Sequence, residues 1–291
     1  MDEQVKNALS KLPQIILAFW IMSAANWSER MDEQAKNALS KVPQVTLVFW
    51  IIKILATTLG ETGGDAVTMS WLGETTVNAT GWGYLLGTAI FGAVFAIAVF
   101  WQIKAEKFHS LLYWFTIVAT TTVGTTLADY LTRSVGIGYT GGSAILLACV
   151  IASLTIWRYS TGSISIGTVN TRQIEIYYWV TIMFSQTLGT ALGDWVVDEA
   201  GLGYLGSAAI FGAILLLVAV LHFWTNISKP ILFWIAFITT RPLGAVVGDF
   251  LDKPIEKGGL ELSRYAASAV LLATIVALIF IFKQKPAEEA H

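Results

Sequence analysis

Eight runs of about 20 mostly apolar residues constrain this chain more than any other feature of its sequence. A helix of that length crosses a bilayer and satisfies its own backbone in lipid. The alternating ten-residue pattern of a membrane barrel does not occur. The sequence therefore predicts an all-α integral membrane protein with eight transmembrane helices. The runs cover roughly residues 43–65, 81–101, 110–131, 138–157, 174–196, 203–224, 230–250 and 264–282.

The composition supports this fold class and excludes several functions. Of the 291 residues, 55% are hydrophobic and 13% are charged, whereas soluble domains carry about 25% charged residues. The net charge of −2 offers no basic surface for nucleic acid. The sequence contains no Gly-x-Ser-x-Gly, His-Glu-x-x-His or phosphate-binding motif. We therefore expect that the protein is not an enzyme, needs no cofactor and binds no nucleic acid.

Lys and Arg are distributed unevenly between the two sets of connections. Twelve lie in the N-terminal 42 residues, the even-numbered connections and the C-terminus, and only four lie in the other connections. Basic residues accumulate on the cytoplasmic side of a membrane. We therefore expect both termini to be cytoplasmic, with the 66–80 and 196–203 connections outside. The four basic residues on the outer side are Arg133, Lys253, Lys257 and Arg264.

A fourfold repeat is evident in the first helix of each helix pair. Each of these helices carries a Gly, three residues, a small residue and an Asp, with a Trp fifteen residues before the Asp. Two spacings that recur four times are hard to obtain by chance. The sequence predicts four parallel two-helix repeats, pseudo-symmetric about the membrane normal. They span about residues 43–105, 109–160, 172–225 and 229–283, which form one eight-helix domain over 43–283, followed by a tail at 284–291.

On Trp50, Trp114, Trp179, Trp234 and the four Gly-x-x-x-small-Asp units, the chain resembles a bacterial family of uncharacterised integral membrane proteins. That family is built from four tandem two-helix repeats, each with a characteristic Trp. The resemblance covers about residues 42–283. It implies a multi-pass protein of the bacterial inner (plasma) membrane, and it implies no biochemical activity. We expect the Trp set in an aromatic belt at the cytoplasmic interface.

The first 30 residues lie outside the repeats. Residues 1–22 match residues 31–52 at 16 of 22 positions, which indicates a local tandem duplication. The apolar stretch Leu12–Trp27 is short for a membrane span. We expect an interfacial helix there, with a short extra transmembrane helix as the alternative. Residues 31–42 are expected to form a cytoplasmic N-terminal segment, and Met31 is an alternative start.

The four repeated carboxylates are the first candidate for a functional role, and they are Asp65, Asp129, Asp194 and Asp249. They lie near the outer end of each first helix. In a structural role, each caps the next turn or bonds the backbone of the neighbouring repeat. In a functional role, the four form an oxygen-lined ring that attracts cations. Glu61 lies one turn below Asp65 in a Gly-rich segment, and this pair suits a hard divalent cation. Glu61 and Asp65 are thus the candidate metal ligands.

A polar layer is expected eight residues before each Asp, about 12 Å deeper along an ideal helix. It comprises Thr57, Thr121, Gln186 and Arg241. Lys53 lies about one turn below this layer. A charge near the bilayer midplane costs at least about 2.5–3.5 kcal/mol, so Arg241 and Lys53 need an anion. In a closed ring the first and last repeats are neighbours, so we expect Arg241 to face Glu61. Pro242 favours a kink or break in the seventh span, as in transporters.

These features predict a membrane transporter or channel-like protein for a small solute, with a cation, divalent metals included, as the favoured substrate. Its partners are the lipid bilayer and a small solute or ion, and no oligomer is required. The alternative is a non-transporting membrane scaffold, or a lipid- or partner-binding protein, in which the buried charges only pair with one another. The residues expected along the path are Asp65, Asp129, Asp194, Asp249, Glu61, Lys53, Arg241, Thr57, Thr121 and Gln186.

Overall fold

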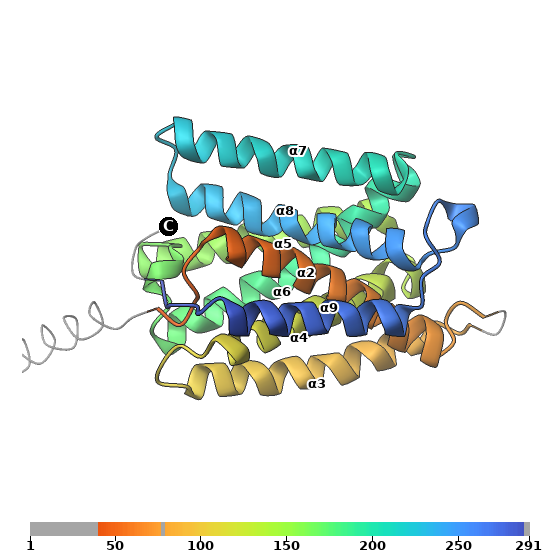
Figure 1. Cartoon of the computed structure of the whole chain (residues 1–291), viewed down its shortest axis with the longest axis horizontal. Helices are drawn as coiled ribbons and strands as arrows, with labels where there is room; N and C mark the ends of the chain where they lie inside the picture. The colour runs from red at the N-terminus through yellow and green to blue at the C-terminus, as the bar shows by residue number, and fades with distance from the viewer. Residues whose placement is uncertain (1–39, 77–78, 288–291) are drawn as a thin grey trace, which may run out of the picture. The chain divides into compact units, whose positions relative to one another are not determined.

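Eight long α-helices and no strand make up the described part of the chain, residues 40–76 and 79–287 of this computed structural model. Figure 1 labels them from α2 onward. Each predicted apolar run corresponds to one helix, whereas the predicted helix at Leu12–Trp27 lies outside the described residues. The helices are α2 (Leu47–Asp65), α3 (Trp82–Lys104), α4 (Ser110–Asp129), α5 (Gly138–Thr161), α6 (Arg172–Asp194), α7 (Gly203–Trp224), α8 (Lys229–Asp252) and α9 (Arg264–Ile281).

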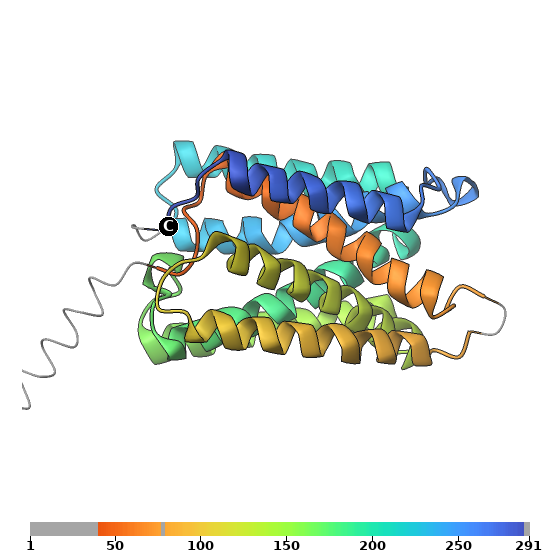
Figure 2. The same ribbon diagram turned by 60° about the horizontal axis from the view of Figure 1, so that its bottom comes forward.

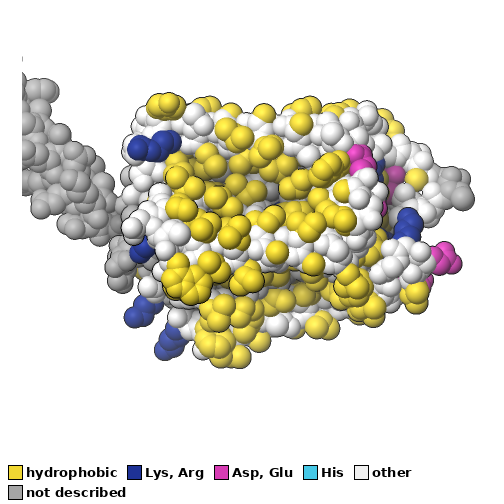
Figure 3. All heavy atoms as spheres, turned by 90° about the horizontal axis from the view of Figure 1, so that it is seen from above, with side chains coloured by type: hydrophobic (Ala, Val, Ile, Leu, Met, Phe, Trp, Pro, Cys, Tyr) yellow, Lys and Arg dark blue, Asp and Glu magenta, His cyan; other side chains and the backbone are white. Residues whose placement is uncertain are grey.

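Seven of these eight helices are long and apolar enough to cross a membrane. The exception is α6, whose first half carries Arg172, Gln173 and Glu175. One face of the molecule is covered by apolar side chains between two ends that carry charged groups (Figure 3). A long apolar helix with its apolar side chains exposed is typical of a multi-pass membrane protein.

The first helices of the four repeats form a closed ring. The helices α2, α4, α6 and α8, hereafter the ring helices, contact one another in chain order, and α8 contacts α2. Each second helix packs against the first helix of the next repeat: α3 against α4, α5 against α6, α7 against α8, and α9 back against α2. Figure 2 shows α9, the last helix, beside α2. The expected contact between the first and last repeats is therefore confirmed.

The repeated glycines allow the ring helices to approach closely. A Cβ added at Gly124 would meet Gln186 of the next ring helix at 2.9 Å. The equivalent glycines face the equivalent residues of the next repeat: Gly60 faces Thr121, Gly189 faces Arg241, and Gly244 faces Thr57. Small residues that permit such backbone approach are typical of helix pairs in membranes. The motif thus also determines which side chains enter the ring.

The α-helical conformation of three ring helices ends at the repeated Asp, and one π-helical turn follows. These turns are Ala66–Trp71, Tyr130–Ser134 and Trp195–Glu199. By contrast, α8 continues without a break from Lys229 to Asp252. The break expected at Pro242 is therefore wrong. Pro242 removes one backbone donor, but α8 is packed between α2, α6 and α7, and this packing keeps it helical.

Three of the four repeated Trp side chains lie inside the protein and Trp50 is partly buried, so the expected aromatic belt is wrong for those three. Trp114, Trp179 and Trp234 are at most 2% exposed. Trp114 Nε1 donates to Gln284 Oε1 at 2.7 Å, and Trp234 Nε1 donates to the carbonyl of Ile164 at 2.9 Å. These rings face neighbouring ring helices rather than lipid, because they share the face that carries the Gly motif. They form an aromatic core with Phe49, Tyr113, Tyr178 and Phe233.

Candidate functional site

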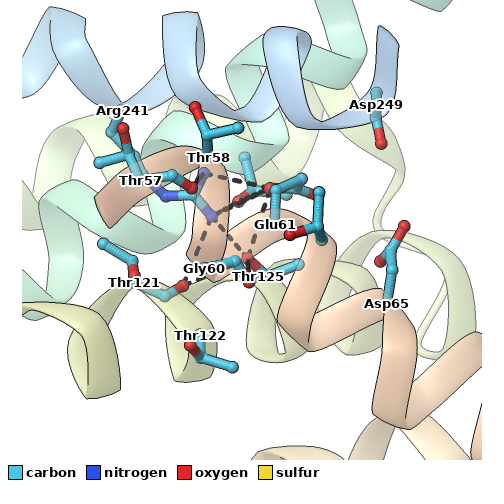
Figure 4. A network of polar contacts seen from close by, with 12 residues as sticks. Thr57, Thr58, Gly60, Glu61, Asp65, Thr121, Thr122, Thr125, Arg241 and Asp249 are labelled. Atoms are coloured by element: carbon cyan, nitrogen blue, oxygen red, sulfur yellow. Dashed lines mark hydrogen bonds and ion pairs between the residues drawn. The ribbon is translucent and has the colours of Figure 1, made fainter. Parts of the chain in front are cut away.

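Arg241 and Glu61 meet inside the ring, where both side chains are buried. Arg241 Nη1 and Nη2 donate to Glu61 Oε2 at 3.1 and 3.0 Å. Figure 4 shows the guanidinium reaching from α8 toward Glu61 on α2. The predicted contact between the first and last repeats is confirmed. Gly189 of α6 and Gly248 of α8 leave the room into which these two side chains fit.

Two threonines complete this central network. Arg241 Nη2 lies 2.6 Å from Thr125 Oγ1 on α4 and 2.5 Å from Thr190 Oγ1 on α6. Each hydroxyl also lies 3.3 Å from Glu61 Oε2. A hydroxyl that accepts from the guanidinium can donate its own hydrogen to the carboxylate. All four ring helices therefore hold one charge pair. Sequence reasoning missed both threonines, although they stand four residues before their Asp, as Glu61 does.

The predicted polar layer lies directly beside this network. Thr57 Oγ1 donates to the carbonyl of Thr240 at 3.2 Å, and Thr121 Oγ1 donates to the carbonyl of Ala56 at 3.1 Å. Both hydroxyls thus link neighbouring ring helices. Gln186 differs, because neither its amide oxygen nor its amide nitrogen has a partner among the described residues, although the side chain is fully buried.

Lys53 lies apart from the acidic residues. Its side chain is fully buried, and its Nζ has no hydrogen-bond partner in the described part of the chain. The amine lies 4.2 Å from the centroid of the Phe237 ring on α8, a cation–π contact. Lys53 on α2 and Phe237 on α8 occupy the same position in their repeats. At this position α4 and α6 carry Ile117 and Ile182, both buried. Glu61 therefore pairs with Arg241 and not with Lys53.

The four repeated Asp residues, hereafter the Asp ring, are bridged in two pairs by cations. Arg133 Nε lies 2.9 Å from Asp129 Oδ1, and its Nη2 lies 3.1 Å from Asp194 Oδ2. Lys253 Nζ lies 3.0 Å from Asp249 Oδ1 and also contacts Asp65. Each cation follows its own Asp by four residues and reaches the Asp of the next ring helix.

The capping role considered for these carboxylates is not observed. Asp65, Asp129 and Asp194 make no side-chain capping bond to the π-helical turns that follow them. Sequence reasoning placed Arg133 and Lys253 in outer connections and missed their role. The signal was the Asp-to-cation spacing of four residues, which places both side chains on one helix face.

Three carboxylates form the candidate cation site. Glu61, Asp65 and Asp249 offer ligand atoms within 4.8 Å of one another, and all three residues are buried. In Figure 4 the carboxylates of Asp65 and Asp249 face each other between α2 and α8. Asp249 thus joins the predicted pair. Arg241 and Lys253 already contact these three carboxylates. With all five groups ionised, the three carboxylates carry one more charge than the two cations.

A pocket of about 560 Å³, hereafter the vestibule, lies at the end of the ring that carries the Asp ring. This volume is in the range of small-molecule sites. Arg133 and Lys253, which bridge the Asp ring, also line the vestibule. Burial disfavours the charged amine, but the carboxylates of Asp249, Asp65 and Asp252 hold the pKa of Lys253 well above its ordinary value. The lining consists of Met69, Ser70, Thr75, Arg133, Asp252, Lys253, Pro254, Lys257, Glu261, Leu262, Ser263, Arg264 and Tyr265.

An all-helical chain with tandem helix pairs and seven helices able to cross a bilayer belongs to the class of multi-pass membrane proteins with internal repeats. Within that class, the chain belongs to the family described as Repeat of Unknown Function (DUF347), which matches residues 48–108, 112–163, 177–228 and 232–284. The predicted family of four tandem repeats is therefore confirmed. No curated protein and no solved structure matches this chain.

Proposed function

We propose that this protein transports a small solute across the bacterial inner membrane, along the axis of the ring helices. The observation that carries this proposal is a series of buried polar atoms inside the ring without partners among the described residues. Such atoms are rare in proteins and cost free energy unless water or a ligand reaches them. They include Lys53 Nζ, Gln186 Oε1 and Nε2, Arg241 Nε, Asp65 Oδ1 and Asp129 Oδ2.

These atoms come from all four ring helices and extend from Lys53 to the Asp ring. In this proposal the four repeats are parallel and pseudo-symmetric about the membrane normal, so the ring axis crosses the bilayer. The uneven distribution of Lys and Arg supports cytoplasmic termini and an external vestibule. The vestibule then opens the path toward the outside.

A cation takes part in transport in this proposal. Glu61, Asp65 and Asp249 carry one more charge than Arg241 and Lys253 compensate. One proton or one monovalent cation balances the site. The proposal thus keeps the cation expected from the four carboxylates. Here the cation is an ion whose movement is coupled to that of the solute.

A scaffold without transport is the second candidate. It is favoured by the ion pairs of the Asp ring, in which every carboxylate has a cation partner. In a scaffold these pairs serve folding alone. Loss of one carboxylate then lowers stability, and no uptake is present to be affected.

Uptake into liposomes tests the proposal. The purified protein is reconstituted and assayed with protons, Na⁺, K⁺, Mg²⁺ and Mn²⁺, alone and with small organic acids, amines and sugars. We expect uptake of at least one solute, reduced about ten-fold or more by Asp249→Asn. Asp198→Asn is the matched control, since Asp198 is exposed on the π-helical turn after α6. No uptake across the panel, or an unchanged rate for Asp249→Asn, contradicts the proposal.

A further inference from the structure

Lys53 is a buried basic side chain without an acidic partner among the described residues. The nearest acid along α2 is Glu61, eight residues further on, about 12 Å along the helix. Glu61 Oε2 is already shared by Arg241, Thr125 and Thr190. Lys53 Nζ meets only the face of the Phe237 ring, which does not balance its charge. A buried ammonium group without a partner is costly, so this position requires an explanation.

Two further donors without partners lie on α8, which contacts α2, and on α6, which contacts α8. Phe237, over which Lys53 Nζ lies, is one turn from Arg241 on α8. Arg241 uses Nη1 and Nη2 for Glu61 and the threonines, and its Nε has no partner in the described ranges. Gln186 on the adjacent α6 stands at the same level as Arg241 in its repeat. Its amide nitrogen is also without a partner.

We infer that Lys53, Gln186 and the Nε of Arg241 receive an anionic group, and that the solute of the proposed transporter is a small anion such as a carboxylate. An oxyanion accepts hydrogen bonds from several donors at once, and bonds to an ionised acceptor are the strong ones. A cation here is repelled by Lys53 and Arg241. A neutral solute leaves Lys53 and Arg241 Nε without a charged acceptor.

The cation site lies between the vestibule and Lys53. Glu61 and Asp65 stand on α2 between Lys53 and the end of the helix that faces the vestibule. An anion that moves inward must pass these carboxylates. A proton or monovalent cation bound there lowers the repulsion, so anion and cation cross this level together. The inference rests on the proposed function for transport, whereas the binding site itself is independent of transport.

Binding in detergent tests the site directly. The thermal unfolding midpoint of the purified full chain is measured in sodium HEPES, with sodium chloride, acetate, succinate or phosphate added at constant sodium concentration. We expect at least one of these anions to raise the midpoint in a saturable way. Lys53→Met is expected to weaken that anion's apparent affinity about ten-fold or more. The same variant is expected to unfold at a higher temperature without anion, since an unpaired charge is removed.

Three further variants separate binding from folding. Lys53→Arg keeps the charge and is expected to retain anion binding. Ile117→Val changes an apolar residue at the same level and is expected to leave the affinity unchanged. Gln186→Leu removes an amide donor and is expected to weaken binding even if Lys53→Met does not fold.

The outcomes distinguish this inference from the proposed function. If none of the four anions stabilises the wild-type chain, or if Lys53→Met and Gln186→Leu bind as tightly as wild type, the inference is wrong. Cation uptake without anion binding contradicts the inference alone. Anion binding without any uptake contradicts the proposed function and leaves the anion site in place.

Discussion

Glu61 and Arg241 join the first and last repeats at the centre of the ring, with 3.0 Å between Arg241 Nη2 and Glu61 Oε2. Both side chains are almost completely buried. The attraction between them opposes the cost of removing both charges from water. Removal of one partner leaves the other charged and buried. Loss of one partner is therefore expected to lower the free energy of unfolding more than the net contribution of the intact pair.

A double-mutant cycle tests this interaction. We predict that Glu61→Gln and Arg241→Gln each lower the free energy of unfolding by about 3–5 kcal/mol. The double variant is expected to lose clearly less than the sum of the two, because neither charge is then left alone. Unfolding by sodium dodecyl sulfate in mixed micelles measures each change. Thr122→Val is the control, since this hydroxyl donates only to Val118 of its own helix. Additive losses mean that the two residues do not interact.

The sequence was sufficient to predict this pair, because buried charges in apolar helices must find partners and only a few candidates exist. It was insufficient for the Asp ring. Arg133 and Lys253 stand just past the apolar runs, so charge counting assigned them to connections. Their position over neighbouring carboxylates depends on the rotation of each helix. Helix rotation is determined by packing, which hydropathy does not report.

The ring helices themselves are held together by the glycines of the repeated motif. A Cβ at Gly60 would overlap the side chain of Thr121 and come within 2.9 Å of its backbone carbonyl carbon. A side-chain end can rotate away from such a contact, but a helix backbone cannot. The contact therefore limits how closely α2 and α4 approach each other.

Two Gly-to-Ala substitutions test this role of the motif. We predict that Gly60→Ala lowers the free energy of unfolding by about 1–3 kcal/mol through overpacking. Gly212→Ala in α7 is the matched control, since no other atom lies within 4 Å of its Cβ position. It is expected to be neutral, or to stabilise by up to about 1 kcal/mol through helix propensity. Both are measured by the same unfolding assay. Equal effects of the two substitutions refute the proposed packing role.

At the level of helices, apolar length was a reliable guide to where each element lies, because lipid imposes that length. The π-helical turns after α2, α4 and α6 carry no apolar-length signal, and they were not predicted. The unbroken path of α8 through Pro242 was also not predicted. Pro242 removes one helical donor, and contacts with three neighbouring helices keep α8 helical there.

The described part of the molecule is closed by contacts between its first and last segments. The last helix, α9, packs against α2 rather than against its own partner in the repeat. Next to this contact, the backbone N–H of Ala287 donates to the carbonyl of Val42 at 2.8 Å, and that of Gln44 to the carbonyl of Lys285 at 2.8 Å. The two ends of the described chain thus run side by side. Closure gives α2 the same surroundings as the other ring helices.

A cross-link between the first and last repeats tests this closure. Thr62 Oγ1 on α2 lies 2.9 Å from Ser268 Oγ on α9, although 206 positions separate the two residues. In a Cys149→Ala background, we predict that Thr62→Cys and Ser268→Cys form a disulfide under mild oxidation in the intact membrane. Because the loop it closes is so long, the bond is expected to stabilise the fold by about 5 kcal/mol in the chain-entropy description.

Gel mobility with and without reductant detects the bond. Thr239→Cys with Ser268→Cys is the control, because the Thr239 hydroxyl donates to its own helix. If both thiols of the Thr62 pair remain free, α9 does not close the ring onto α2.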